Sequence, residues 1–207
     1  MTRWSIIILI LAILVAAYAV YDTQHPRQTP LPQNTPQIIP GVSSVEYRDG
    51  EFGFSIFYPE TANPSVTNYD GYLPRTQTPA ASFVLPANMS LGTNLSEAGV
   101  YIGATSSPAI VATCASSSPE LNETAQGTTT ISGTNFSVFT SSDAGAGNFY
   151  ETKTLRTVHG DLCFEIVELL HSTNIGNYDP GTVLVFDKTA FQGYLDAMVK
   201  TFTFTDR

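Results

Sequence analysis

The sequence has few charged residues, and few basic ones in particular. Only 13% of its 207 residues are charged, about half of the roughly 25% found in a typical soluble chain. Its 9 Lys and Arg stand against 18 Asp and Glu, for a net charge of −9. Binding to nucleic acid depends on basic side chains that neutralise phosphates, so we expect no nucleic-acid partner. Apolar residues make up 43%, which is enough for a packed core and excludes wholesale disorder.

The short motifs of several enzyme classes are also absent. The sequence contains no Gly-x-Ser-x-Gly, no His-Glu-x-x-His, no Cys-x-x-Cys and no Walker A pattern. Gly145-Ala146-Gly147 lacks the third glycine of a dinucleotide-binding loop, and we predict a turn there. Ser55 alternates with aromatic residues, as expected of a strand residue rather than a nucleophile. We therefore predict a non-enzymatic protein without a cofactor.

One long hydrophobic run is present, at residues 4–21, and only Ser5 interrupts it. As a helix the run spans roughly 27 Å, close to the hydrocarbon thickness of a bilayer. Arg3 precedes it, and positive charge stays on the cytoplasmic side. We predict a single-pass cell-membrane protein with a transmembrane anchor at residues 1–21 and the rest outside the cytoplasm. The alternative is a secretory signal that is cleaved after the small-x-small motif Ala17-Tyr18-Ala19 and releases the protein.

The composition changes twice after the hydrophobic run. Residues 22–43 contain five prolines among Gln and Thr. Because proline fixes φ and lacks an amide donor, this stretch predicts an extended linker. Residues 44–207 carry the apolar periodicity of a folded domain, which we expect to be extracytoplasmic.

The domain has the pattern of an antiparallel sheet. Residues 44–48 and 52–58 flank Asp49-Gly50, a strong hairpin signal. Further along, short glycine-containing links, which require antiparallel neighbours, join four β-type runs. These runs are 128–131, 134–141, 147–158 and 161–172. Short strands are also expected at 81–85 and 99–104, and an irregular surface excursion at 60–80.

Two helices and a final strand complete the expected elements. Pro108 is suited to the first turn of a short helix over 109–114. Asp187 is a candidate N-cap for a helix with one apolar face. That face comprises Phe191, Tyr194, Leu195, Met198 and Val199. Residues 201–204 predict a closing strand. The fold class is therefore α+β, an antiparallel meander flanked by helices.

The sequence has only two cysteines, Cys114 and Cys163, 49 residues apart. Outside the cytoplasm an even count favours a disulfide. Closing a loop of this length stabilises the fold by roughly 4 kcal/mol in the chain-entropy treatment. The alternative, two buried thiols, suits a cytosolic protein.

Two motifs resemble those of the PsbP-like fold. They are the Phe-Gly-Phe-Ser-Ile-Phe-Tyr-Pro segment at Phe52–Pro59 and the terminal Thr-Phe-Thr-Phe at Thr201–Phe204. The resemblance covers roughly residues 44–207, and it implies an α/β/α sandwich in a small membrane-anchored bacterial envelope protein. It also implies a non-catalytic binding or assembly role, with an unknown envelope protein or ligand as partner. The sequence departs from that family in its long Ser/Thr/Pro-rich stretch and in its two cysteines.

The strongest candidate for a binding site follows the last long strand. It comprises His171 and the loop residues Asn174, Asn177, Tyr178 and Asp179. Loop-borne polar residues on a rigid sheet suit recognition. Three alternatives remain: His171 bonding its own loop, a calcium ion held by the loop oxygens, and a hydrolase or metal-dependent enzyme using His171 with the 172–181 loop. His171 and Glu165 share a strand face but lie about 20 Å apart, too far to share one ion.

Overall fold

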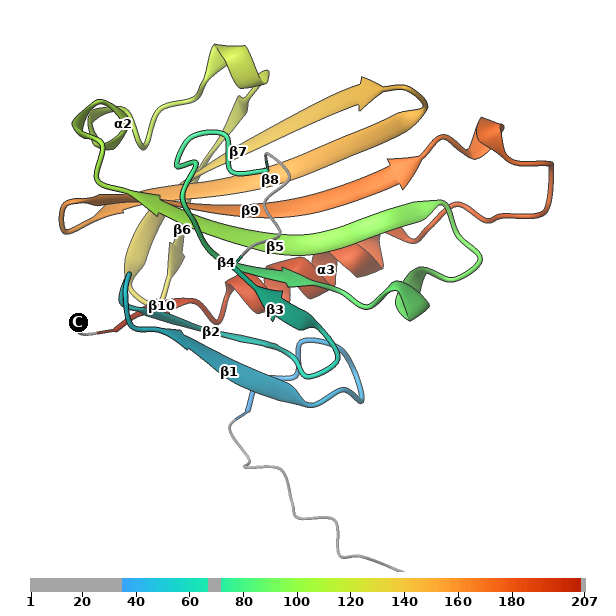
Figure 1. The fold of residues 1–207 in the computed structure, drawn as a ribbon, viewed down its shortest axis with the longest axis horizontal. Helices are drawn as coiled ribbons and strands as arrows, with labels where there is room; N and C mark the ends of the chain where they lie inside the picture. The colour runs from blue at the N-terminus through green and yellow to red at the C-terminus, as the bar shows by residue number, and fades with distance from the viewer. Residues whose placement is uncertain (1–34, 67–71, 206–207) are drawn as a thin grey trace, which may run out of the picture. The chain divides into compact units, whose positions relative to one another are not determined.

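The computed structural model describes residues 35–66 and 72–205. Their compact unit begins at Pro36 and contains two antiparallel sheets (Figure 1). The predicted anchor at residues 1–21, and the linker up to residue 34, lie outside the described residues. Within the described part of the chain, no helix is long and apolar enough to cross a bilayer.

The smaller sheet joins the two ends of the domain. Its order is β1 (Ser44–Asp49), β2 (Phe54–Pro59) and β10 (Thr203–Phe204). The predicted hairpin and closing strand are confirmed. In the hairpin turn the Asp49 carboxylate accepts the N–H groups of Glu51 and Phe52, at 2.9 and 2.7 Å. The turn closes at Gly53, whose positive φ of 71° suits glycine.

The larger sheet has seven strands in the order β3-β4-β5-β9-β8-β7-β6, and every pair is antiparallel. The strands are β3 (Asn63–Ser65), β4 (Pro79–Val84), β5 (Leu95–Thr105), β6 (Thr124–Ile131), β7 (Thr134–Gly145), β8 (Asn148–His159) and β9 (Leu162–Thr173). The predicted meander from β6 to β9 is confirmed. Its turns centre on Ser132-Gly133, Ala146-Gly147 and Gly160-Asp161, and the first two pairs have positive φ at both residues.

The described residues contain two α-helices, α2 (Pro108–Ala112) and α3 (Lys188–Val199). Both begin where the sequence predicts, and Asp187 caps α3 by accepting the N–H of Ala190 at 3.0 Å. Short 3₁₀ helices occur at η1 (Ala87–Ser90), η2 (Pro119–Leu121) and η3 (Ile175–Asn177). The domain is thus mostly β, with fewer helices than the sandwich implied by the resemblance. Prolines at 108 and 119 begin only short helices in the Ser-rich segment between β5 and β6.

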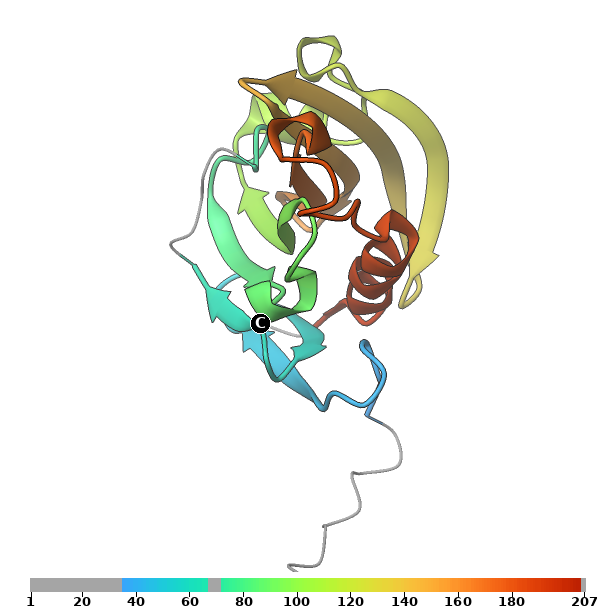
Figure 2. The ribbon, with the colours of Figure 1, turned by 90° about the vertical axis from the view of Figure 1, so that its right-hand side faces the viewer.

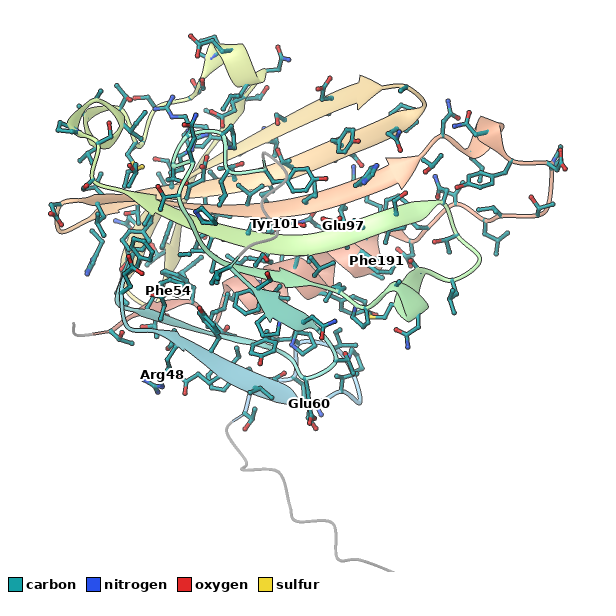
Figure 3. The ribbon with its side chains drawn as sticks, in the orientation of Figure 1. Arg48, Phe54, Glu60, Glu97, Tyr101 and Phe191 are labelled. Atoms are coloured by element: carbon teal, nitrogen blue, oxygen red, sulfur yellow. A yellow bond between two sulfur atoms is a disulfide. The ribbon has the colours of Figure 1, made fainter. Side chains whose placement is uncertain are left out.

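The main core lies between the small sheet, α3 and one face of the large sheet. Phe54 of β2 and Phe191 of α3 contribute to it (Figure 3). Its other buried side chains include Ile56, Phe83, Ile102, Phe164, Ile166, Leu195 and Phe202. Ile38 and Ile39 are buried there as well, so the last residues of the predicted linker pack on the domain. The excursion at 60–80 is not confined to the surface, because it contains β3 and the buried Leu73.

The opposite face of the large sheet holds a closed ionic group, which we call the Arg156 cluster (Arg156, Glu165 and Glu123). Arg156 donates through Nε to Glu165 at 3.1 Å and also bonds Glu123. The three side chains are at most 4% exposed. The second oxygen of Glu165 accepts the backbone N–H groups of Arg75 and Thr76. These contacts attach the 72–77 segment to the sheet.

The predicted disulfide is confirmed on this same face. Cys114 lies just after α2 and bonds to Cys163 of β9, with 5.7 Å between the Cα atoms. The bond ties the segment between β5 and β6 to the centre of the sheet. A disulfide is typical of proteins outside the cytoplasm.

Candidate functional site

The residues predicted as a binding site lie together at the end of β9, but they bond mainly to one another and to the neighbouring turn. His171 Nε2 is 3.0 Å from Oδ1 of Asn148, and its ring stacks on Tyr150 with centroids 4.3 Å apart. The histidine therefore bonds the β7–β8 turn across the strand rather than its own loop. The amide partner does not supply the acid–base pair that a hydrolase at His171 requires.

The loop after His171 is likewise held by local hydrogen bonds. Asn174 caps η3 by accepting the N–H of Gly176 at 2.9 Å. Asn177 donates its amide to the carbonyl of Gly147 at 3.4 Å. Tyr178 and Asp179 lie at the surface. Across residues 35–66 and 72–205, no group of three His, Cys, Asp or Glu side chains is arranged to hold a metal ion.

Exposed apolar side chains gather at the same end of the domain. We call this surface the loop end, and it comprises Leu91, Phe149, Ile175, Leu184 and Val185. Leu91 is 77% exposed, and Leu184 and Val185 are each 68% exposed. The loops that carry them lie at one end of the ribbon (Figure 1). Solvated aliphatic side chains of this size, when clustered, mark surfaces that contact another molecule.

Backbone hydrogen bonds hold the loop end in shape. Leu184 donates its N–H to Gly92, and its carbonyl accepts the N–H of Asn94, both at 2.9 Å. The side chain of Asn94 then accepts the N–H of Phe186 at 3.0 Å. The exposed leucine and its neighbours are therefore on a paired segment and not on a free loop tip.

A polar groove begins beside the loop end, on the face of the large sheet that α3 covers in part. We call it the α3 groove. Hydroxyl and charged side chains lie next to one another on its floor, because Thr140 of β7 is paired with Lys153 of β8, and Ser142 is paired with Glu151. Lys188 and Gln192 of α3 line its wall. In Figure 2 the outer strands curve around α3.

The groove has two connected parts. The polar part encloses about 460 Å³, and the part nearer the loop end encloses about 590 Å³. Both are lined by Ser142 and Glu151, and the second also by Phe149, Val185 and Phe186. These volumes fall within the range of small-ligand sites, roughly 300–1,000 Å³.

An ionic group connects the groove floor to α3, and we call it the Lys153 cluster (Lys153, Glu168, Asp196 and Gln192). Lys153 of β8 lies 3.3 Å from Glu168 of β9 and also bonds Asp196 of α3. Gln192 donates to Glu168, and lies 3.4 Å from Asp196. The Glu168 side chain is fully buried, whereas Lys153 and Asp196 are 31% and 32% exposed.

Burial separates the two carboxyl groups of the Lys153 cluster in pKa. Desolvation raises the pKa of Glu168 to about 8, against the opposing charge of Lys153. Burial acts in the same direction on Asp196, but hydrogen bonds from Lys153 and Glu168 outweigh it and lower the pKa of that carboxyl. At neutral pH, Glu168 therefore carries a proton and Asp196 carries the charge that neutralises Lys153.

The sequence did not lead us to predict the α3 groove, although the polar residues that line it interrupt apolar patterns in the sequence. Glu168 interrupts an otherwise apolar face of β9, and Gln192 and Asp196 lie beside the apolar face of the predicted helix. Thr140 and Ser142 continue the face of β7 that carries the apolar residues Phe136 and Val138. Combining these signals requires the strand register and the position of α3, and neither follows from the spacing of residues.

No protein-family model matches the sequence, and no curated protein matches it. Among solved structures, the chain is similar to a Bacteroides thetaiotaomicron protein, with 14% identity and a TM-score of 0.45 over 78% of this chain. It spans about half of that protein's length, 48%. LpqN, involved in cell envelope biogenesis of Mycobacterium tuberculosis, gives 10% identity and a TM-score of 0.44, covering 80% of this chain and 92% of LpqN.

The structures found also include a cyanobacterial PsbP, CyanoP from Synechocystis. Its identity is 11% and its TM-score is 0.34, with 84% of this chain and 99% of that protein covered. The PsbP-like resemblance seen in the sequence motifs thus has a PsbP among the structural matches. At these identities the likeness concerns the fold, and not a ligand or an activity.

Proposed function

We propose that this chain is a non-enzymatic binding domain outside the cytoplasm, held at the cell membrane by residues 4–21, and that the loop end binds a partner protein of the envelope. The observation that carries the proposal is the cluster of solvated aliphatic side chains on a hydrogen-bonded segment at Leu184 and Val185. The disulfide between Cys114 and Cys163 supports the compartment.

Charge favours a protein over a lipid surface as the partner. The chain has a net charge of −9, and Asp179 lies exposed on the loop that follows Ile175. Negatively charged headgroups repel carboxylates at close range. A protein surface with an apolar centre and a basic rim complements the loop end on both counts.

Photo-crosslinking in membranes tests this proposal with the full chain. A photoreactive residue at Val185 is expected to give a discrete protein adduct, and one at Val158 to give none. Val158 is a matched control because it is exposed and apolar but lies in β8 next to the β8–β9 turn. The adduct is expected to disappear in Leu184→Ser, since that change removes apolar contact from an exposed position and leaves the core intact. Lipid adducts at Val185, or a protein adduct that persists in Leu184→Ser, would contradict the proposal.

A further inference from the structure

The α3 groove differs from the loop end in what it offers a ligand. Its floor is one continuous face, because Thr124 is paired with Thr140, and Thr140 with Lys153. The backbone groups of β7 and β8 are already used in the sheet ladder. A ligand in the groove is therefore recognised by side chains, and a peptide cannot add there as an extra strand.

The charged side chains of the groove are already paired. Lys188 bonds Glu151, and Lys153 bonds Asp196. An incoming anion would compete with these carboxylates, and an incoming cation would compete with the lysines. The pair of Lys188 is exposed and contributes little. Lys153 and Asp196 are partly buried beside the fully buried Glu168, and breaking their pair leaves a charge without its partner, so this part of the groove disfavours ions. A neutral ligand leaves both pairs in place.

The remaining polar groups are hydroxyls and amides. Thr124, Thr140 and Ser142 contribute hydroxyls, and the hydroxyl of Thr140 also accepts the amide of Gln126 at 2.9 Å. Asn122 contributes an amide, and Gln192 contributes its amide oxygen, because its nitrogen donates to Glu168. A hydroxyl is both donor and acceptor, and an amide offers one group of each kind. This set matches a ligand whose own groups are hydroxyls and amides, each able to donate and to accept.

The neighbouring part of the groove adds an aromatic surface. Phe149 is 42% exposed and lies on the same strand face as Glu151 and Lys153, two and four residues away. The C–H face of a sugar ring is apolar and packs against an aromatic ring, while the hydroxyls at the ring edge remain free for hydrogen bonds. Polar and aromatic surfaces in one groove, without a net charge, are what a sugar chain requires.

We propose that the α3 groove binds a neutral saccharide, with ring hydroxyls on the Thr140 and Ser142 side and a sugar ring on Phe149. The site shares Phe149 with the loop end, but Thr140 and Ser142 lie outside the loop end, and the site does not depend on a protein partner. Two uncharged probes test it: the tetramer of N-acetylglucosamine, and maltotetraose. Binding is measured by titration calorimetry on the full chain, in a detergent whose headgroup is not a sugar.

The double variant Thr140→Val, Ser142→Ala removes two hydroxyls and keeps both ion pairs. We expect at least one probe to bind the unaltered protein and to lose tenfold or more in affinity in the double variant. Ser137→Ala is the matched control. It changes a hydroxyl of β7 on the opposite face, where Ser137 is paired with Arg156, and we expect it to bind as the unaltered protein does.

Several outcomes would overturn the saccharide site. These are no binding of either probe, equal affinity in the double variant, or a loss as large in Ser137→Ala. Tighter binding of inorganic phosphate or of tetra-alanine at the same residues would also overturn it. Crosslinking at Val185 in the double variant reports separately on the partner protein, so failure of one proposal is distinguishable from failure of the other.

Discussion

The two ionic clusters lie on opposite faces of the same sheet and differ in their access to solvent. The Arg156 cluster is closed on all sides, since its three side chains are at most 4% exposed. The Lys153 cluster has one fully buried member, Glu168, and two members that are about one-third exposed. The first cluster connects loop segments to the sheet beside the disulfide. The second connects α3 to the sheet and borders a groove.

The difference follows from what covers each face. Residues 72–77 and 113–123 lie over the Arg156 cluster and contribute backbone partners, such as the carbonyl of Ser116 at 2.9 Å. α3 packs its apolar side over β9 and β5 and leaves part of the outer strands β6–β8 open, at Thr124, Thr140 and Glu151. The Arg156 cluster therefore has a structural role, whereas the Lys153 cluster both attaches α3 to the sheet and borders the groove.

The largest effect on stability is expected when the Arg156 cluster loses its cation. Arg156→Met leaves Glu165 and Glu123 buried without their cation, which is expected to cost about 3–5 kcal/mol of unfolding free energy. Urea unfolding followed by circular dichroism measures it. Arg48→Met is the control, because Arg48 is 67% exposed in its pair with Glu46, and exposed pairs contribute about 0–1 kcal/mol. Equal effects of the two variants would refute the contrast between closed and open pairs.

A second prediction concerns the proton on Glu168. Because burial raises its pKa from 4.5 to about 8, the folded state binds more protons than the unfolded state between these two values. Its contribution to stability is therefore complete below about pH 4.5 and is lost as the pH rises through 8. The slope is at most about 1.4 kcal/mol per pH unit. The lowered pKa of Asp196 and the raised pKa of Lys153 act outside this window.

Glu168→Gln removes the titrating group and keeps most of its volume. We expect unfolding free energy to lose most of its decline between pH 5 and 8 in this variant. Glu60→Gln is the surface control, since Glu60 is exposed, and we expect the full decline to remain there. If the unfolding free energy of Glu168→Gln declined as much as that of the unaltered protein, a group other than Glu168 would bind the proton responsible.

The smallest effect is expected at the start of α3. Asp187→Ala removes the carboxylate that accepts the N–H of Ala190, at an expected cost of about 1 kcal/mol. Asp187→Asn retains a capping oxygen and is expected to restore most of it. Thermal melting of the two variants decides this, and equal losses in both would point to the charge rather than the cap.

Much of the fold could be predicted because its signals are local. The Asp49-Gly50 and Ser132-Gly133 turns, the meander from β6 to β9, and the cap and apolar face of α3 all follow from spacings of a few residues. Strand lengths were harder to predict. β5 has 11 residues where six were expected, because Ser96 and Glu97 at its start are polar although the backbone there is paired with β9.

The candidate site was predicted less well than the fold. Sequence spacing brings His171 and residues 174–179 together, and the structure confirms that proximity. Their side chains, however, bond the backbone of their own loop and the turn at Gly147 and Asn148. The α3 groove combines residues from strands β6 to β9, from helix α3 and from neighbouring loops. In the sequence, Glu168 is only a polar residue on an apolar strand face. The structure shows its role, because Gln192 and Asp196, more than 20 residues later in the chain, lie beside it.

The sequence by itself determined most of the segments that form strands and the helix that has an apolar side, because these depend on residues near one another in the chain. It also determined which two cysteines could pair, because it contains only two. The tertiary structure decided which face each strand presents to α3, how far α3 extends over the sheet, and therefore where a groove remains. Those features depend on register and packing between segments distant in sequence. A hydroxyl or carboxyl side chain has the same local signal whether it borders a groove or is buried beneath a loop.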